Sequence, residues 1–299
     1  GRNFCSKIWN AFRLIKGWTV DDNIQASDAA KLAVHWFESK QNEVAAEVAD
    51  LFSKYRLSEA LMAVYKLFWD EFSSWYLEMI KPAYGQGIDR TTYSATLCFL
   101  DNLLHLLHPF MPFITEELWQ QMYERNAEEG ESLMVSALSM DTYVDTAFVA
   151  QFEVVKGVIS NIRSIRLQKN IAQKEPLDLQ VLGENPVAEF NAVIQKMCNL
   201  SSITVVESKA EGASSFMVGT TEYAVPLGNM IDVEAEIARM EAELKHKEGF
   251  LQGVLKKLSN EKFINNAPAA VLEMERKKQA DAESIISSLK ESIAALKKA

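Results

Sequence analysis

Hydrophobic residues recur every three or four positions along most of this chain, which is the spacing expected of amphipathic α-helices. One face of the first helix is apolar, and Gly17 is expected to end that helix. The residues on this face are Phe4, Ile8, Phe12 and Ile15. The same spacing predicts further helices over residues 28–55, 57–80, 91–108, 115–122 and 145–169. Residues 1 to about 145 are therefore predicted to form a helical bundle with short connections.

The pattern changes after residue 169, where short runs rich in β-branched residues replace the helical spacing. These runs cover residues 177–182, 203–206, 215–218 and 223–226, and a helical segment is expected at Val187–Cys198. Short strands and one helix form a small α+β module when they pack together. We predict such a module between the helical bundle and the last part of the chain.

The last 70 or so residues carry two apolar seams whose spacing alternates between three and four, as in a coiled coil. The first seam consists of Met230, Val233, Ile237, Met240, Leu244, Lys247, Leu251, Val254 and Leu258, and the second of Ala282, Ile286, Leu289, Ile293 and Leu296. A polar stretch of about ten residues separates them and ends at Pro268, which suits the first turn of a helix. Helices joined so closely are antiparallel neighbours, and at ~1.5 Å per residue each extends about 40 Å.

These patterns predict a mainly α protein with three parts. Residues 1–145 form the helical bundle, residues 146–229 form the small α+β junction module, and residues 230–299 form an antiparallel coiled-coil hairpin. No initiating methionine precedes the first helical residues, which indicates a piece of a longer protein. Three scattered cysteines, with no signal peptide and no long apolar run, favour a cytoplasmic protein that does not enter a membrane.

The chain is acidic overall, but its charge is unevenly distributed. It has 31 lysine and arginine residues against 41 aspartate and glutamate residues, which argues against a general coat for nucleic acid. The outer part of the hairpin has the opposite sign. Its basic residues are Lys256, Lys257, Lys262, Arg276, Lys277 and Lys278, against Glu261, Glu273 and Glu275. Such a local surplus indicates either a directed contact with an anion such as an RNA backbone or an ordinary solvated coiled-coil surface.

Two further groups of residues have the chemistry of RNA contacts. The polar face of the first helix and the position just beyond it contain Arg2, Asn3, Lys7, Asn10, Arg13, Lys16 and Trp18. The predicted helix over residues 145–169 contains Arg163, Arg166 and Lys169. Arginine and lysine bind phosphates, asparagine hydrogen-bonds to base edges, and an exposed aromatic ring can stack on an unpaired base. We therefore predict RNA contacts on both helices and at the hairpin tip.

The sequence contains no recognisable catalytic or metal centre. It has no glycine-rich phosphate loop followed by Lys-Ser/Thr, no dinucleotide fingerprint and no Gly-x-Ser-x-Gly elbow. His105 and His108 lie three residues apart among leucines, without the cysteine or carboxylate that a zinc site requires, and we interpret them as packed or capping residues. We therefore predict no catalytic residue, metal ligand or cofactor site in this chain.

Several segments resemble a known family. Gly1–Ala11 resembles the opening of the anticodon-binding domain of class I aminoacyl-tRNA synthetases, and Trp69–Glu78 and Leu106–Trp119 resemble later helices of that domain. These motifs are shared by the valyl, leucyl and isoleucyl enzymes. The hairpin segments Lys257–Val271 and Glu273–Lys277 resemble the C-terminal coiled-coil arm of the valyl-tRNA synthetase family.

The resemblance implies a function in tRNA binding. The helical bundle would bind the anticodon stem-loop, and the arm would bind the outer corner of tRNA(Val). Full-length members of the family are valine–tRNA ligases (EC 6.1.1.9), which use ATP and Mg²⁺ and carry an editing domain. Their His-x-Gly-His and Lys-Met-Ser-Lys-Ser type motifs do not occur in this sequence. We therefore expect a monomeric, non-catalytic segment whose partners include upstream catalytic and editing domains.

Two alternatives remain open from the sequence. The segment could belong to a leucyl- or isoleucyl-tRNA synthetase, which aminoacylation of purified tRNAs by the parent protein would decide. It could instead be a non-catalytic adaptor whose coiled coil pairs with another chain, which predicts a concentration-dependent dimer. Lys247, Glu275 and Gln279 lie within the seams and argue against a long intermolecular zipper.

Overall fold

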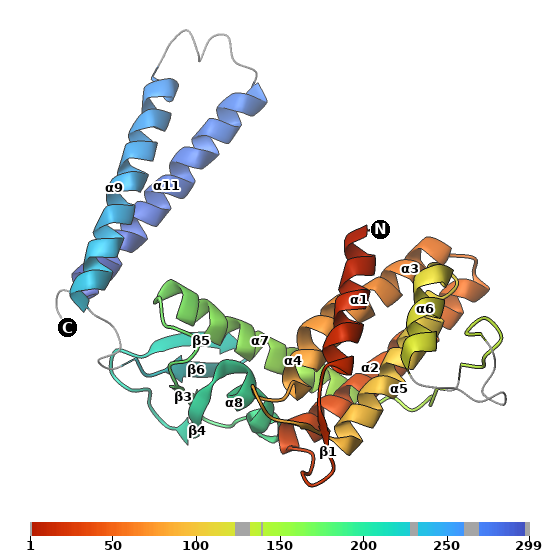
Figure 1. Cartoon of the computed structure of the whole chain (residues 1–299). Helices are drawn as coiled ribbons and strands as arrows, with labels where there is room; N and C mark the ends of the chain where they lie inside the picture. Colours follow the sequence, from red (N-terminus) through yellow and green to blue (C-terminus); the bar gives the residue numbers. More distant parts are fainter. Residues whose placement is uncertain (1, 123–131, 139, 228–232, 260–268, 297–299) are drawn as a thin grey trace. The chain divides into compact units, whose positions relative to one another are not determined.

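The computed structural model describes residues 2–122, 132–138, 140–227, 233–259 and 269–296 (Figure 1). The chain forms two compact units. The first contains residues 1–167 and 172–226, and the second contains residues 168–171 and 227–299. The predicted fold class is confirmed: the described residues are mainly helical, with a small four-stranded sheet in the first unit and a pair of long helices in the second.

The N-terminal part of the first unit is a helical bundle. Its helices are α1 (Arg2–Lys16), α2 (Asp28–Ser53), α3 (Leu57–Lys66), η1 (Leu67–Tyr76), α4 (Leu77–Ile80), α5 (Arg90–Leu107) and α6 (Pro112–Met122). Gly17 follows the last residue of α1, as predicted, and the four predicted apolar residues of α1 are all buried. At the start of α2, the Ser27 hydroxyl accepts a hydrogen bond from the Ala30 N–H and caps the helix.

The segment between α3 and α4 is a π-helix, η1, which the hydrophobic spacing did not indicate. Phe68, Phe72 and Tyr76 lie four residues apart along it, and all three are buried. The centroid of the Phe37 ring in α2 lies 5.2 Å from that of Phe72, and the centroid of the Phe99 ring in α5 lies 5.4 Å from that of Tyr76. These aromatic residues therefore form part of the core of the bundle.

A short parallel bridge joins the segment after α1 to the start of α5. Strand β1 (Val20–Asp21) pairs with strand β2 (Ile88–Asp89), and two residues per strand are too few for a sequence pattern to reveal. Beside the bridge, the Arg90 guanidinium donates two hydrogen bonds to the Asp22 carboxylate, at 2.5 and 2.9 Å. The bridge therefore holds the loop before β1 next to the loop before β2.

The rest of the first unit is an α+β layer. Its elements are α7 (Thr146–Gln168), β3 (Leu177–Leu182), η3 (Ala188–Phe190), α8 (Asn191–Cys198), β4 (Leu200–Val206), β5 (Ser214–Val218) and β6 (Thr221–Val225). The strand order is β4-β3-β6-β5, with β3 and β4 parallel and the other pairs antiparallel. The ring of Phe152 in α7 stacks on Trp36 of α2 at 4.1 Å, which joins this layer to the bundle. The four predicted strands all form.

The second unit contains α9 (Val233–Leu258) and α11 (Ala269–Leu296), which lie side by side (Figure 1). Two ion pairs establish that these helices are antiparallel. Lys257 at the end of α9 lies 3.9 Å from Glu275 at the start of α11. Further from the turn, Glu248 and Lys290 lie 2.8 Å apart. The predicted helical hairpin is therefore confirmed.

The predicted seams face the interior of this hairpin wherever their side chains are described. Buried members are Val254, Ala282, Ile286 and Ile293, and half-buried members are Leu244, Lys247, Leu251 and Leu258. Pro268 and the side chains of Met230, Val233, Ile237, Met240, Leu289 and Leu296 lie outside the described part of the chain. The apolar contact between the arms is thus made within one chain.

Asp145 connects the bundle to the start of α7. Its carboxylate accepts a hydrogen bond from the Phe148 N–H at 3.1 Å, and its other oxygen lies 3.1 Å from His35 Nε2. These two hydrogen bonds, that from Phe148 first, lower the pKa of Asp145. Because folding lowers the pKa of this carboxyl group, its charged form stabilises the folded state at a pH above the pKa of the unfolded chain. The stabilisation decreases as the pH falls below that value and is lost once the pH falls below the lower pKa of the folded chain.

We expect the Asp145→Asn variant to be less stable than the parent chain at pH 7, because the amide replaces a charged acceptor. The difference in unfolding free energy should shrink as the pH falls below 3.8, the ordinary pKa of an aspartate, and continue to shrink through the lower folded pKa. Urea unfolding of the parent chain and the variant at several pH values measures this difference in unfolding free energy. An equal difference at pH 7 and pH 2 would contradict this role of Asp145.

Candidate nucleic-acid interface

Helix α1 carries a strip of polar residues on the side opposite its buried face. The members of this polar strip are Arg2, Asn3, Asn10 and Arg13, and all four are exposed. They share one side because residues three, seven or eleven positions apart return to the same side of an α-helix. The structure therefore brings together two guanidinium groups, which bind phosphates, and two amide groups, which hydrogen-bond to base edges.

The two lysines of α1 lie at the borders of the polar strip and contact protein groups. Lys7 Nζ lies 5.3 Å from the centre of the Trp69 ring, within the range of a cation–π contact. Lys16 Nζ donates a 2.8 Å hydrogen bond to the carbonyl oxygen of Met122, the last residue of α6. It thereby satisfies a carbonyl group that the end of a helix leaves without a partner. Both lysines thus have a protein partner, and Lys7 is half-buried, although Lys16 is exposed like the arginines of the polar strip.

Trp18 lies just beyond the end of α1 and lines a hollow of about 660 Å³. The hollow is bounded by the loop that follows α1 and by the loop over residues 81–87. Gly87 permits the two loops to approach closely, since a β-carbon at this position would lie 2.9 Å from the carbonyl oxygen of Thr19. Tyr84 lines the same hollow, and its side chain is completely exposed.

Tyr84 is a candidate contact residue that the sequence pattern did not identify. It stands between Pro82 and Gly85, two residues typical of turns, and Gly85 has a φ of +77°. A large aromatic residue in such an exposed turn was the available signal. Its position beside Trp18 depends on the β1–β2 bridge, which could not be predicted.

Arg163 and Arg166 both lie on α7 but have different surroundings. Arg163 is exposed, and its guanidinium lies 5.6 Å from the centre of the Trp75 ring. Arg166 is only 1% exposed, and it donates hydrogen bonds to the carbonyl oxygens of Ala172 at 2.9 Å and Cys198 at 2.7 Å. A phosphate cannot reach a guanidinium that is buried and occupied in this way. The structure therefore removes Arg166 from the RNA contacts that the sequence predicted.

Lys169, the third predicted residue of this group, is half-buried and belongs to the segment 168–171. That segment groups with the second compact unit, whereas Arg163 and Arg166 belong to the first. Arg163 is the member that the first unit exposes.

Glu275 organises basic residues of the arm. It is 6% exposed, its Oε1 accepts a 2.8 Å hydrogen bond from Lys278, and its Oε2 lies 3.9 Å from Lys257 Nζ. The hydrogen bond from Lys278 lowers the pKa of Glu275, burial opposes this effect, and the charge of Lys257 adds to it. Lys257 and Lys278 are thus partly neutralised by a carboxylate within the seam.

Three other basic residues of the arm are exposed, namely Lys256, Arg276 and Lys277. Within the described part of the arm, no carboxylate lies at ion-pair distance from them. Lys262, which was predicted to belong to the same basic tip, lies outside the described residues. The arm therefore presents unneutralised positive charge on its outer part, as a contact with an anion requires.

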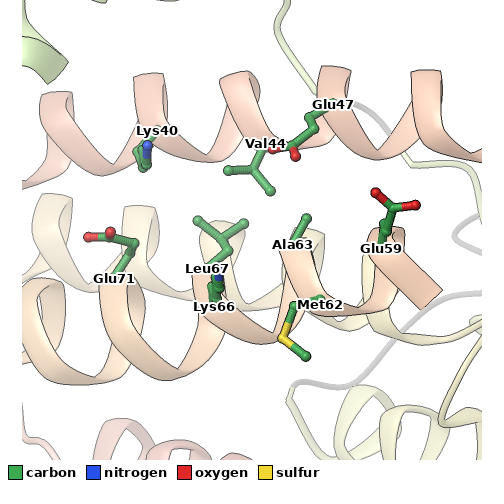
Figure 2. A pocket seen from close by; sticks show the side chains of 9 residues that line it. All are labelled: Lys40, Val44, Glu47, Glu59, Met62, Ala63, Lys66, Leu67 and Glu71. Carbon is green, nitrogen blue, oxygen red and sulfur yellow. The ribbon is translucent and has the colours of Figure 1, made fainter. Parts of the chain in front are cut away.

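A second hollow, of about 390 Å³, lies between α2 and the α3–η1 segment (Figure 2). Figure 2 shows Lys40 and Glu71 at one end of it and Glu47 and Glu59 towards the other. Lys66 is the remaining charged residue of its lining. With three carboxylates and two ammonium groups, the lining of this hollow is net negative and does not favour binding of a polyanion such as RNA.

The described residues offer no alternative metal chemistry. Among them, no group of three histidine, cysteine, aspartate or glutamate side chains could hold a metal ion. His105 Nε2 lies 2.8 Å from the Ser136 hydroxyl, and His108 Nδ1 lies 2.8 Å from the Thr115 hydroxyl. These contacts agree with the interpretation of both histidines as packed residues. None of the described helices is both long and apolar enough to cross a membrane.

Two segments of the chain match known protein families. Residues 34–181 match the anticodon-binding domain of tRNA ligases, and residues 232–297 match the valyl-tRNA synthetase tRNA-binding arm. The first match begins within α2 and extends through α7 into β3, and the second includes all of α9 and α11.

The chain is also similar along its length to curated proteins named valine–tRNA ligase. It is 72% identical over 298 residues to that of Phocaeicola vulgatus, 70% identical over 298 residues to that of Bacteroides fragilis, and 63% identical over 298 residues to that of Parabacteroides distasonis. These alignments cover 99–100% of this chain and 34% of each relative. The chain belongs to the valyl-tRNA synthetase family.

This member of the valyl-tRNA synthetase family spans about a third of the length of the curated relatives it matches. It contains an anticodon-binding domain of the class I tRNA ligases and the tRNA-binding arm. The arm decides between the valyl family and the leucyl and isoleucyl families, which the motifs of the bundle left open. Its basic outer residues Lys256, Arg276 and Lys277 all lie within the matched arm.

Proposed function

We propose that this chain is the tRNA-holding part of a valine–tRNA ligase, which joins valine to tRNA(Val) at the expense of ATP. The observation that carries the proposal is the match of one chain to both an anticodon-binding domain and a valyl tRNA-binding arm. This proposal assigns the ATP and Mg²⁺ of such an enzyme to its other domains, because the sequence of this chain has no phosphate-binding glycine loop. Catalysis and editing belong to other domains of the full-length enzyme.

In this proposal, residues 1–145 bind the anticodon stem-loop and residues 146–229 form a junction to the arm over residues 230–299. The polar strip of α1 contributes most of the anticodon contacts. Arg2 and Arg13 bind phosphates, while Asn3 and Asn10 hydrogen-bond to bases; Lys7 and Lys16 border the strip, and Trp18 stacks on a base beyond its end. The exposure of the four strip residues supports this assignment.

The arm binds the outer corner of the tRNA, where its two hairpin loops meet. Its phosphate contacts come from Lys256, Lys257, Lys262, Arg276, Lys277 and Lys278, and Arg163 and Lys169 add contacts nearer the junction. The exposed charges of Lys256, Arg276 and Lys277 support this role. Phosphate contacts supply affinity, whereas base contacts supply identity, so the arm and α1 have separable effects.

We also propose that the chain acts as a monomer in the cytoplasm. The seams of α9 and α11 pack on each other within one chain, which leaves no need for a second copy. This arrangement favours tRNA binding over the alternative of an adaptor that pairs through its coiled coil.

A charge-removal variant of the arm tests its part in the proposal. In the triple variant Lys256→Gln, Arg276→Gln and Lys277→Gln, affinity for tRNA(Val) should fall, and the slope of log K against log salt should become shallower by up to about 3. The ratio of affinities for tRNA(Val) and a tRNA of another amino acid should not change. Filter binding at several salt concentrations measures all three quantities. An unchanged slope would contradict the proposed contacts of the arm.

A further inference from the structure

We propose that the hollow beyond the end of α1, which Trp18 and Tyr84 both line, receives one unpaired nucleobase of the tRNA anticodon loop, and that this base stacks on the ring of Tyr84. This inference rests on the proposed function. It adds to that function a binding site for a single base and a residue, Tyr84, outside the first helix.

The hollow has the size and the preformed walls of a ligand site. Its volume of about 660 Å³ lies within the range of ~300–1,000 Å³ that is typical of small-molecule sites. The Ile88 N–H donates a 2.9 Å hydrogen bond to the Thr19 carbonyl oxygen and fixes one loop against the other. Gly87 allows this approach, because any larger residue would collide with the same carbonyl group. The space therefore does not require a ligand in order to form.

The aromatic residues of the hollow suit a nucleobase. Tyr84 is completely exposed, and Trp18 is half-buried at the opposite loop. In the part of the chain that the structure describes, neither ring contacts another aromatic ring, so each can accept a stacking partner. Stacking on an aromatic side chain is the common way in which proteins bind unpaired bases of RNA. The main chain around Gly85 and Gly87 lacks side chains that would hinder the edge of a base.

The position of the hollow connects it to the polar strip. Asn10, Arg13 and Gly17 are three and four residues apart, so they follow one side of α1, and Gly17 is part of the hollow's lining. An RNA backbone that follows the strip therefore reaches the hollow at the end of the helix. Lys81 also lines the hollow and is exposed, and its Nζ lies 3.8 Å from a carboxylate oxygen of Glu78. A phosphate next to the stacked base would compete with this weak surface ion pair for the Lys81 cation.

A double-mutant cycle between protein and RNA tests this site. The protein variants are Tyr84→Ala, Tyr84→Phe and, as a matched control, Tyr55→Ala, since Tyr55 is 89% exposed at the end of α2. The RNAs are the anticodon stem-loop of tRNA(Val) and versions with one abasic nucleotide at each loop position. Affinities of the full chain for each RNA are measured by fluorescence anisotropy, and circular dichroism verifies that the variants fold.

We expect Tyr84→Ala to weaken binding of the intact stem-loop by about 5- to 100-fold, while Tyr84→Phe and Tyr55→Ala bind almost normally. At one abasic position, removing the base and the Tyr84→Ala substitution should each reduce the binding free energy, but the two losses should not add, because both changes remove the same contact. Additive losses at every position, or an unaffected Tyr84→Ala variant, would overturn the stacking site while leaving the proposed function intact. Failure of the parent chain to bind the stem-loop would overturn the proposed function and this inference with it.

Discussion

The Arg166→Ala variant is expected to lose about 3–5 kcal/mol of unfolding free energy, more than any exposed charge of the chain would cost. Truncating a long buried side chain leaves a cavity, and the carbonyl oxygens of Ala172 and Cys198 lose their donor. The Arg166→Met variant keeps much of the packing volume, so it should lose only about 1–3 kcal/mol, from the hydrogen bonds alone. Urea unfolding at pH 7 measures both values.

Arg163→Ala is the matched control, because it removes the same side chain three residues earlier on α7. Arg163 is exposed and contacts the Trp75 ring, which is worth about 0.5–1 kcal/mol. A loss at Arg166 no larger than that at Arg163 would contradict a structural role. So would an Arg166→Met variant that kept its stability but lost affinity for tRNA, since a buried guanidinium has no access to phosphate.

The double variant Arg2→Gln and Arg13→Gln is expected to reduce affinity for tRNA(Val) by about 2–5 kcal/mol. Both arginines are exposed on the polar strip, and glutamine keeps part of their length while removing the charge. Discrimination between anticodons should fall along with affinity, because these arginines position Asn3 and Asn10 against the bases. Filter binding to two tRNA transcripts that differ only in the anticodon measures both effects.

The control for this variant removes two positive charges from another surface. Lys31 and Lys54 lie near the two ends of α2, and their side chains are 61% and 55% exposed. The double variant Lys31→Gln and Lys54→Gln has the same formal net charge as the strip variant but should retain discrimination. Equal losses in the two double variants would show that general charge, and not the polar strip, accounts for binding.

The sequence predicted those parts of the fold that depend on local spacing. The buried face of α1 and the seams of the arm both follow from residues near one another in the chain. The β1–β2 bridge could not be predicted, since two residues per strand make no pattern and their pairing depends on segments far apart in sequence. The π-helix was missed because its aromatic residues, spaced by four, are equally compatible with an α-helix.

The sequence predicted which types of residue form the interface, but it predicted only in part which of them are accessible to RNA. Arg166 follows Ile162 by four residues and Ile159 by seven, so helical spacing alone places it on the buried side of α7, a signal that its charge obscured. Glu275 was recognised within a seam, but its ion pair with Lys257 required knowledge of how α9 and α11 align. Tyr84 carried no periodic signal at all, because its place beside Trp18 depends on tertiary structure.

Recognition of tRNA(Val) through its anticodon is tested most directly by the ratio of the affinities of the unchanged chain for two transcripts. One transcript is tRNA(Val), and the other differs from it only in the anticodon bases. We predict clearly tighter binding of tRNA(Val), by about 1–3 kcal/mol for each base that the chain reads. Equal affinities for the two transcripts at every salt concentration would contradict the account.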